Sequence, residues 1–181
     1  MLGEIIARIR QNDQRAMRQF YQLYVGELTS VCRRYVPDAD EAKDVLQNSF
    51  VKIFKSLPTV DYRGEKAFRG WLHKIVANES LLYLRDRKRQ SFAEQAADME
   101  DTAESGEDPD PEQITPDELH QLIRELPDGY RTVLNLYVFE NYSHRQIAEM
   151  LGIRESTSAS QLHYAKQWLA RRINEMKKKR G

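Results

Sequence analysis

The chain has 181 residues and a formal net charge of zero, and 31% of its residues are charged. This length accommodates one or two domains. The single cysteine, Cys32, excludes an intrachain disulfide and a cysteine-based zinc cage. No apolar stretch approaches the roughly 20 residues that cross a bilayer, and the N-terminus lacks the pattern of a signal peptide. We therefore expect a soluble, cytoplasmic protein without direct membrane insertion.

The zero net charge hides a strong division along the chain. Residues 1–89 carry 17 basic and 11 acidic side chains, a net of +6, and residues 124–181 carry 11 and 6, a net of +5. Residues 90–123 contain 11 acidic residues and no Lys or Arg. Two basic blocks around an acidic segment favour a polyanion as partner.

The N-terminal block has the apolar spacing of a small helical bundle. Helices are predicted over residues 3–10, from the N-cap candidates Asn12 and Asp13 to Pro37, and over 40–57 with caps offered by Asp38 and Asp40. A loop over 58–67, turning at Gly64, leads into a helix over 68–89. The predicted buried positions include Ala16, Phe20, Leu23, Tyr24, Leu28, Val31, Cys32, Tyr35, Val45, Leu46, Phe50, Ile53, Phe68, Trp71, Leu72, Ile75, Val76 and Leu82.

The segment 68–89 combines that apolar stripe with rings and cations. Tyr62 and Tyr83 lie near it in sequence, and its basic residues include Arg69, Lys74, Arg85, Arg87, Lys88 and Arg89. Rings that stack on bases, beside cations that hold phosphates, suit single-stranded nucleic acid. The alternative from this segment alone is an amphipathic core helix with a solvated basic end.

Residues 91–116 lose the helical pattern. The segment is acidic, rich in small residues and contains three prolines, so it cannot bury enough apolar surface to fold alone. We expect a flexible linker there.

The C-terminal block predicts a helix-turn-helix. Helices are expected over 117–126 and 130–139, the latter with Val133, Leu134, Leu136 and Tyr137 inside and Asn141 as its left-handed terminator. Ser143 and Gln146 form a capping box that starts a short helix ended by Gly152. A long helix over 156–177 follows.

The outward face of that last helix carries candidate base-reading side chains. The N-terminal part of the second helix of such a motif enters the major groove. Polar side chains there can donate to or accept from base edges, and the candidates are Thr157, Ser160, Gln161, His163 and Tyr164.

No catalytic constellation is visible. The four histidines, at positions 73, 120, 144 and 163, are scattered and match no metal-binding spacing, and there is no glycine-rich phosphate loop. We expect no metal, no cofactor and no enzymatic activity.

Three stretches together resemble the extracytoplasmic-function (ECF) family of RNA polymerase sigma factors. Residues 38–57 (DADEAKDVLQNSFVKIFKSL) resemble its polymerase-binding helix, residues 61–89 (DYRGEKAFRGWLHKIVANESLLYLRDRKR) its promoter-melting loop and helix, and residues 126–169 its upstream-element reader. The resemblance implies an all-α fold with region 2 at residues 1–90, an acidic linker at 91–116 and region 4 at 117–181.

The resemblance also assigns roles. It implies contacts to the clamp helices of the largest polymerase subunit by Asp44, Gln47, Asn48 and Lys52. It implies contacts to the minus-ten DNA, or support of the loop that makes them, by Tyr62, Arg63, Gly64, Glu65, Lys66, Phe68, Trp71 and Asn78, and minus-thirty-five contacts by the outward face of the last helix. The implied partners are core polymerase, including its flap, promoter DNA and an anti-sigma factor of a kind often anchored in the membrane.

Two other functions fit the residues alone. One is a stand-alone helix-turn-helix regulator whose N-terminal bundle dimerises or senses a signal, for which dimeric binding to a palindrome without polymerase would be evidence. The other is a helical adaptor whose basic faces bind acidic proteins, for which indifference to DNA at low salt would be evidence.

Overall fold

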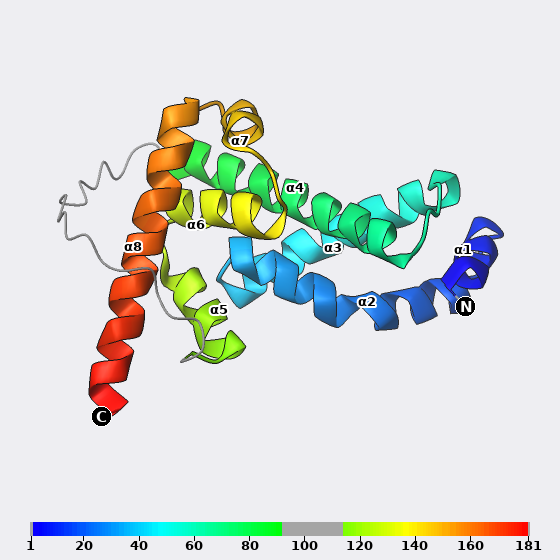
Figure 1. The fold of residues 1–181 in the computed structure, drawn as a ribbon. Coiled ribbons are helices and arrows are strands. Elements are labelled where there is room, and N and C mark those ends of the chain that lie inside the picture. The colour runs from blue at the N-terminus through cyan, green and yellow to red at the C-terminus, as the bar shows by residue number, and fades with distance from the viewer. Residues whose placement is uncertain (1, 92–113, 181) are drawn as a thin grey trace. The chain divides into compact units, whose positions relative to one another are not determined.

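The computed structural model describes residues 2–91 and 114–180. The chain divides into two compact units, residues 1–89 and 90–181, each of which is described by itself. In the described ranges the regular elements are all helices and no strand occurs, which confirms the expected all-α fold (Figure 1).

The first unit contains four α-helices and one short 3₁₀ turn among its described residues. They are α1 (Leu2–Arg10), α2 (Gln14–Tyr35), α3 (Ala39–Ser56), the 3₁₀ turn η1 (Leu57–Thr59) and α4 (Glu65–Ser91). Of the predicted N-caps, Asp13 and Asp38 are confirmed, whereas Asn12 precedes the cap in a left-handed conformation and Asp40 lies inside α3. Asp13 accepts from the backbone N–H of Arg15 and Ala16 at 2.8 and 3.2 Å. Asp38 likewise accepts from Asp40 and Glu41, both at 2.9 Å.

Rings from three helices join in the core of this unit. The Phe20 ring of α2 lies 5.7 Å from Phe54 of α3 and 6.1 Å from Phe68 of α4 between centroids. Phe20 is fully buried and Phe68 is 3% exposed. Cys32 lies in the same core, where burial raises the pKa of its thiol to about 11. The start of α4 is therefore fixed against α2 and α3.

The second unit contains α5 (Pro116–Glu125), α6 (Asp128–Leu134), a π-helical turn (Asn135–Phe139), α7 (His144–Leu151) and α8 (Glu155–Arg180). Helix α8 packs against α5, α6 and α7. The Ser143–Gln146 capping box and the left-handed residues Asn141 (φ 58°) and Gly152 (φ 66°) occur as predicted. The predicted helix-turn-helix is thus present as α7, Gly152 and α8.

Three predicted core residues are instead exposed. Leu23 is 57% exposed because it lies about 100° around the helix from Tyr24, at the edge of the buried stripe. Leu82 is 37% exposed because Ser80 and Leu84, each two residues away, face the core. Tyr137 is 39% exposed because the π-helical turn adds a residue to the helical repeat and rotates it outward.

Six predicted helix starts were late: those of α1, α3, α5 and α8 by one residue, that of α6 by two and that of α4 by three. Helix α4 begins at Glu65 because the carbonyl of Gly64 already accepts from the backbone N–H of Phe68 at 3.1 Å. The carbonyl of Pro127 accepts from Arg131 at 2.9 Å in the same way, so α6 begins at Asp128. Helix α8 begins at Glu155, one residue early.

The acidic linker predicted over 91–116 falls almost entirely on residues outside the described ranges. At its edges, Ser91 is the last residue of α4 and Thr115 is the N-cap of α5. Because Ser91 and Pro116 are helical residues of α4 and α5, the predicted linker was one residue too long at each end.

Candidate functional site

The four residues expected to contact polymerase share one exposed face of α3. Asp44, Gln47, Asn48 and Lys52 are all exposed, whereas Val45, Phe50 and Ile53 are buried on the opposite face. The structure therefore brings these four side chains together on one surface, which we call the α3 face.

One residue of the α3 face already has a partner within the unit. Lys52 donates from Nζ to Oε1 of Glu79 on α4, in an ion pair whose glutamate side chain is only 10% exposed. The pair joins α3 to α4, so Lys52 has a structural role besides any contact with a partner protein.

The sequence-based prediction missed an apolar residue on the α3 face. Val51 is 48% exposed and lies four residues after Gln47 and three after Asn48, which places it among them. Its signal in the sequence was an apolar side chain off the buried stripe. Exposed apolar groups among polar ones are common at protein interfaces.

The loop between η1 and α4 is shorter than predicted. It spans Val60 to Gly64, and Glu65 and Lys66 lie in the first turn of α4 and not in the loop. Gly64 has φ 104°, a conformation that favours glycine, so a side chain here would strain the turn. Within the loop Arg63 donates from Nε to Oδ2 of Asp61 at 2.7 Å.

A cavity of about 400 Å³ lies beside this loop, and we call it the loop pocket. Its volume is in the range of roughly 300–1,000 Å³ that is typical of small-ligand sites. The pocket combines a charged pair, hydroxyl groups and two rings, and it is lined by Ser56, Thr59, Val60, Asp61, Arg63, Ala67, Phe68 and Trp71.

Aromatic side chains form one wall of the loop pocket and its support. The Phe68 ring lies 5.4 Å from Trp71 and 5.7 Å from Tyr62 between centroids. Tyr62 is exposed and Trp71 is half-buried, whereas Phe68 is almost fully buried. Phe68 therefore packs against Tyr62 and Trp71 and contributes little accessible surface to the pocket.

Asn78 is exposed two turns along α4 from Trp71. Residues seven apart lie on one side of a helix, so Asn78 continues the surface that begins at the loop pocket. The exposed surface that begins at the loop pocket therefore includes a polar amide on α4.

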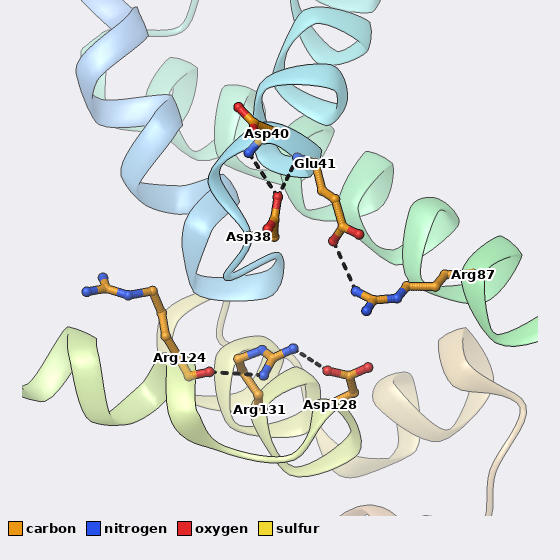
Figure 2. Close-up of polar contacts among 7 residues, drawn as sticks. All are labelled: Asp38, Asp40, Glu41, Arg87, Arg124, Asp128 and Arg131. Carbon is orange, nitrogen blue, oxygen red and sulfur yellow. Dashed lines mark hydrogen bonds and ion pairs between the residues drawn. The ribbon is translucent and has the colours of Figure 1, made fainter. Parts of the chain in front are cut away.

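Part of the basic character expected of α4 is neutralised within the unit. Arg69 pairs with Glu27 at 3.5 Å and with Glu65 at 3.0 Å, and Arg87 donates to Glu41 at 3.0 Å (Figure 2). Lys66, Lys74 and Arg85 are exposed, and the side chains of Lys88 and Arg89 lie outside the described part of the chain. The number of α4 cations available for phosphates is therefore smaller than the sequence suggested.

In the second unit, the outward face of α8 holds the five predicted base-reading residues at different depths. Ser160, His163 and Tyr164 are exposed, and Thr157 and Gln161 are half-buried. The Ser160 hydroxyl donates its hydrogen to the carbonyl of Ser156 at 3.0 Å, so this hydrogen is already used within the helix. Its oxygen remains an acceptor for a partner group.

Helix α6 supports two of these side chains, a feature that the sequence did not reveal. The Tyr164 ring stacks on Tyr130 with centroids 6.0 Å apart and planes at 30°. A Cβ added to Gly129 would lie 3.3 Å from Nε2 of Gln161, so the Gln161 side chain rests directly on that glycine. The first turn of α6 is therefore a platform for the middle of the α8 face.

A buried arginine holds the α5–α6 junction below this platform. Arg131 is 3% exposed, and its Nη1 donates to the carbonyls of Arg124 at 3.3 Å and Leu126 at 2.5 Å (Figure 2). Its Nη2 pairs with Asp128. The guanidinium thus satisfies carbonyls at the end of α5 that lack helical partners.

Comparison with known proteins supports both units. The sigma-70 region 2 model matches residues 20–90, and the sigma-70 region 4 model matches residues 117–169. RNA polymerase sigma-H factor of Pseudomonas aeruginosa is 30% identical over 174 residues, which cover 91% of this chain and 89% of that protein.

The chain belongs to the ECF family of RNA polymerase sigma factors. A second relative, ECF RNA polymerase sigma-E factor of Salmonella typhimurium, is 28% identical over 179 residues, which cover 93% of this chain and 92% of that protein. As an alternative sigma factor, the protein directs RNA polymerase to promoters.

A solved sigma factor has the same fold. The chain is similar to RpoE of Bartonella quintana, solved in complex with the anti-sigma factor NepR, with a TM-score of 0.51 and 18% identity. The match covers 87% of this sigma factor and 96% of that chain. Sigma factors of this family are initiation subunits and not enzymes.

Two structural features are absent from the described residues. In residues 2–91 and 114–180, no three His, Cys, Asp or Glu side chains gather as a metal site requires. None of the helices in those ranges is long and apolar enough to cross a membrane.

Proposed function

We propose that this sigma factor has three parts with different functions. Residues 1–90 dock on core polymerase and open the minus-ten element, residues 117–181 hold the minus-thirty-five element, and residues 91–116 link the two. No covalent chemistry takes place in this subunit.

Polymerase docking uses the α3 face. Asp44, Gln47 and Asn48 offer polar contacts to the clamp helices of the largest subunit, and Val51 offers an apolar centre. The mixture of an apolar residue and a polar rim supports this assignment, because interfaces are commonly built in that way.

The loop pocket receives an unstacked base of the minus-ten element, and the presence of this pocket beside the loop is the observation that carries the proposal. The pocket has a charged pair for base edges and aromatic walls for stacking. Unstacking a base costs a few kcal/mol, and stacking on an aromatic side chain returns about 1–3 kcal/mol per base. Tyr62, Arg63 and Trp71 contact the captured base, and Asn78 contacts the separated strand.

The α8 face reads the upstream element. Ser160, His163 and Tyr164 offer exposed polar side chains to base edges. Gln161, whose side chain packs on Gly129, contributes its terminal amide. Thr157 lies at the edge of this contact.

The sigma factor acts in the cytoplasm and is held inactive by an anti-sigma factor. The Bartonella relative was solved with such a partner, which supports this part of the proposal.

Run-off transcription tests the proposal directly. Core polymerase is supplied with fragmented host DNA, with and without the protein. We expect new start sites that share two upstream motifs at a fixed spacing. An active core enzyme that gains no new starts from the folded protein would contradict the proposed function.

A further inference from the structure

Helix α1 reaches across the first unit to the loop pocket. Arg10, the last residue of α1, donates from Nη2 to the carbonyl oxygen of Val60 at 2.9 Å, a contact between residues fifty positions apart. Helix α1 also packs against η1, the 3₁₀ turn immediately before the loop. Helix α1 lies outside residues 20–90, which the region 2 model matches.

The helix that carries Arg10 is firmly held. Ile5, Ile6 and Ile9 are at most 3% exposed, so one face of α1 is part of the core. Arg8 binds Oδ2 of Asp13 through Nε and Nη2, each at 2.8 Å, which fixes the turn into α2. Arg10 therefore projects from a rigid support.

Val60 is the point where the loop leaves η1. Its backbone N–H donates to the carbonyl of Leu57 at 3.3 Å, and its own carbonyl accepts from Arg10. At the other end of the loop, the carbonyl of Gly64 accepts from the N–H of Phe68. Both ends of the loop are thus held by hydrogen bonds, and the bond to the Val60 carbonyl comes from one side chain of α1.

We infer that Arg10 is a positioning residue for the loop pocket. By fixing the Val60 carbonyl, it sets the direction in which Asp61, Tyr62 and Arg63 leave η1 and so keeps the pocket open in its base-accepting shape. The inference deepens the proposed function and rests on it, because it assumes that the pocket receives a minus-ten base. According to this inference, helix α1 contributes to promoter opening.

A direct contact between Arg10 and DNA would predict a different result. Arg10 is exposed, so its guanidinium is also accessible to a DNA phosphate. A phosphate contact contributes close to one unit to the slope of log affinity against log salt, and its loss reduces that slope by about one. A positioning residue leaves the salt slope unchanged.

The test compares Arg10→Met with the matched control Arg18→Met, since Arg18 is an exposed arginine on α2. Methionine keeps an unbranched apolar stem and removes the donors. Backbone order parameters of residues 61–63 are measured by NMR on the free full-length protein. Opening of a promoter found by run-off transcription is measured by permanganate reactivity at saturating holoenzyme, and the salt slope of promoter binding is measured in parallel.

For Arg10→Met we expect order parameters at residues 61–63 to fall from the rigid range near 0.85 toward about 0.6. We also expect opening to fall about tenfold with an unchanged salt slope, as loss of a hydrogen bond to a charged donor suggests. Arg18→Met should match the wild type in all three measurements. Unchanged order parameters, unchanged opening or a salt slope reduced by about one would each overturn the inference. A wild-type protein that opens no promoter would instead overturn the proposed function.

Discussion

Individual side chains near the candidate surfaces join helices as well as offering contacts. The ion pair between Lys52 and Glu79 is the clearest case, since Lys52 was expected only as a polymerase contact and Glu79 is nearly buried. Removing the lysine leaves a carboxylate without this partner in a poorly hydrated position. Such an uncompensated group destabilises a fold more than the loss of a surface pair does.

We predict that Lys52→Met lowers the free energy of unfolding of the first unit by about 1 kcal/mol, because the lysine is itself half exposed and its pair is partly screened. Urea unfolding measures the change. Asn48→Ala, on the same face, is the control and should stay within about 0.5 kcal/mol of wild type. Equal stability of the two variants would show that the pair contributes nothing.

Arg131 is the corresponding residue in the second unit. We predict that Arg131→Met costs about 2 kcal/mol or more, because two carbonyls and the Asp128 carboxylate lose a buried charged donor. Urea unfolding followed by Trp168 fluorescence in a Trp71→Phe background reports this unit alone, since the chain has two tryptophans.

Arg124→Met is the matched control for Arg131→Met. Arg124 takes part in this contact through its backbone carbonyl, and its side chain points away in Figure 2. We expect a change within about 0.5 kcal/mol for this variant. A loss as large as that of Arg131→Met would indicate a role for charge in general and not for the buried guanidinium.

At the scale of elements, the aspartate N-caps of α2 and α3 make helix stability depend on pH. The backbone N–H of Glu41 is the main cause of the lowered pKa of Asp38, and the hydrogen bond from Arg8 is the main cause of the lowered pKa of Asp13. A carboxyl group whose pKa is lower when folded stabilises the fold above its unfolded pKa. That stabilisation disappears as pH falls from about 4 through the folded pKa.

We predict that Asp38→Asn weakens this acid dependence, because asparagine still caps α3 but does not titrate. Thermal unfolding between pH 7 and pH 3 measures it. The wild type should lose more stability than the variant over the acid part of that range. Parallel pH profiles for the two proteins would contradict a role for the Asp38 charge.

Local chemistry made several elements predictable from the sequence. Asp13, Asp38, the Ser143–Gln146 box and Gly152 are short-range signals whose hydrogen bonds or backbone angles depend on neighbouring residues, and each occurs as expected. The start of α4 was missed because Gly64 was interpreted only as a turn residue, whereas its carbonyl accepts the first helical hydrogen bond, from the N–H of Phe68.

The missed features depend on tertiary contacts or on irregular backbone. The π-helical turn at 135–139 breaks the uniform repeat on which a helical wheel relies, so Tyr137 was assigned to the core. The bond from Arg10 to Val60 and the stack of Tyr130 on Tyr164 join residues 50 and 34 positions apart, and no local pattern encodes them. The polymerase and minus-ten roles came from family resemblance, the base-reading role of the α8 face also came from helix-turn-helix geometry, and all of these roles stay predictions.

At the scale of the whole molecule, opposite charges are separated along the chain. The two folded blocks are basic, and the segment between them is acidic. Within the first unit, the α3 face and the surface formed by the loop pocket and Asn78 share no residue, although Ser56 at the end of α3 lines the pocket. Polymerase binding and promoter opening should therefore be separable by substitution.

Paired measurements on two variants test this separation most directly. Core polymerase affinity and the open fraction of promoter at saturating holoenzyme are measured for Gln47→Ala and Asn78→Ala, both exposed positions. We predict about tenfold weaker polymerase binding for Gln47→Ala with normal opening at saturation. We predict polymerase binding within about twofold of wild type but strongly reduced opening for Asn78→Ala, since loss of a strand contact leaves the α3 face intact. Normal opening by Asn78→Ala, or equal losses of both activities in both variants, would contradict two separate surfaces in this unit.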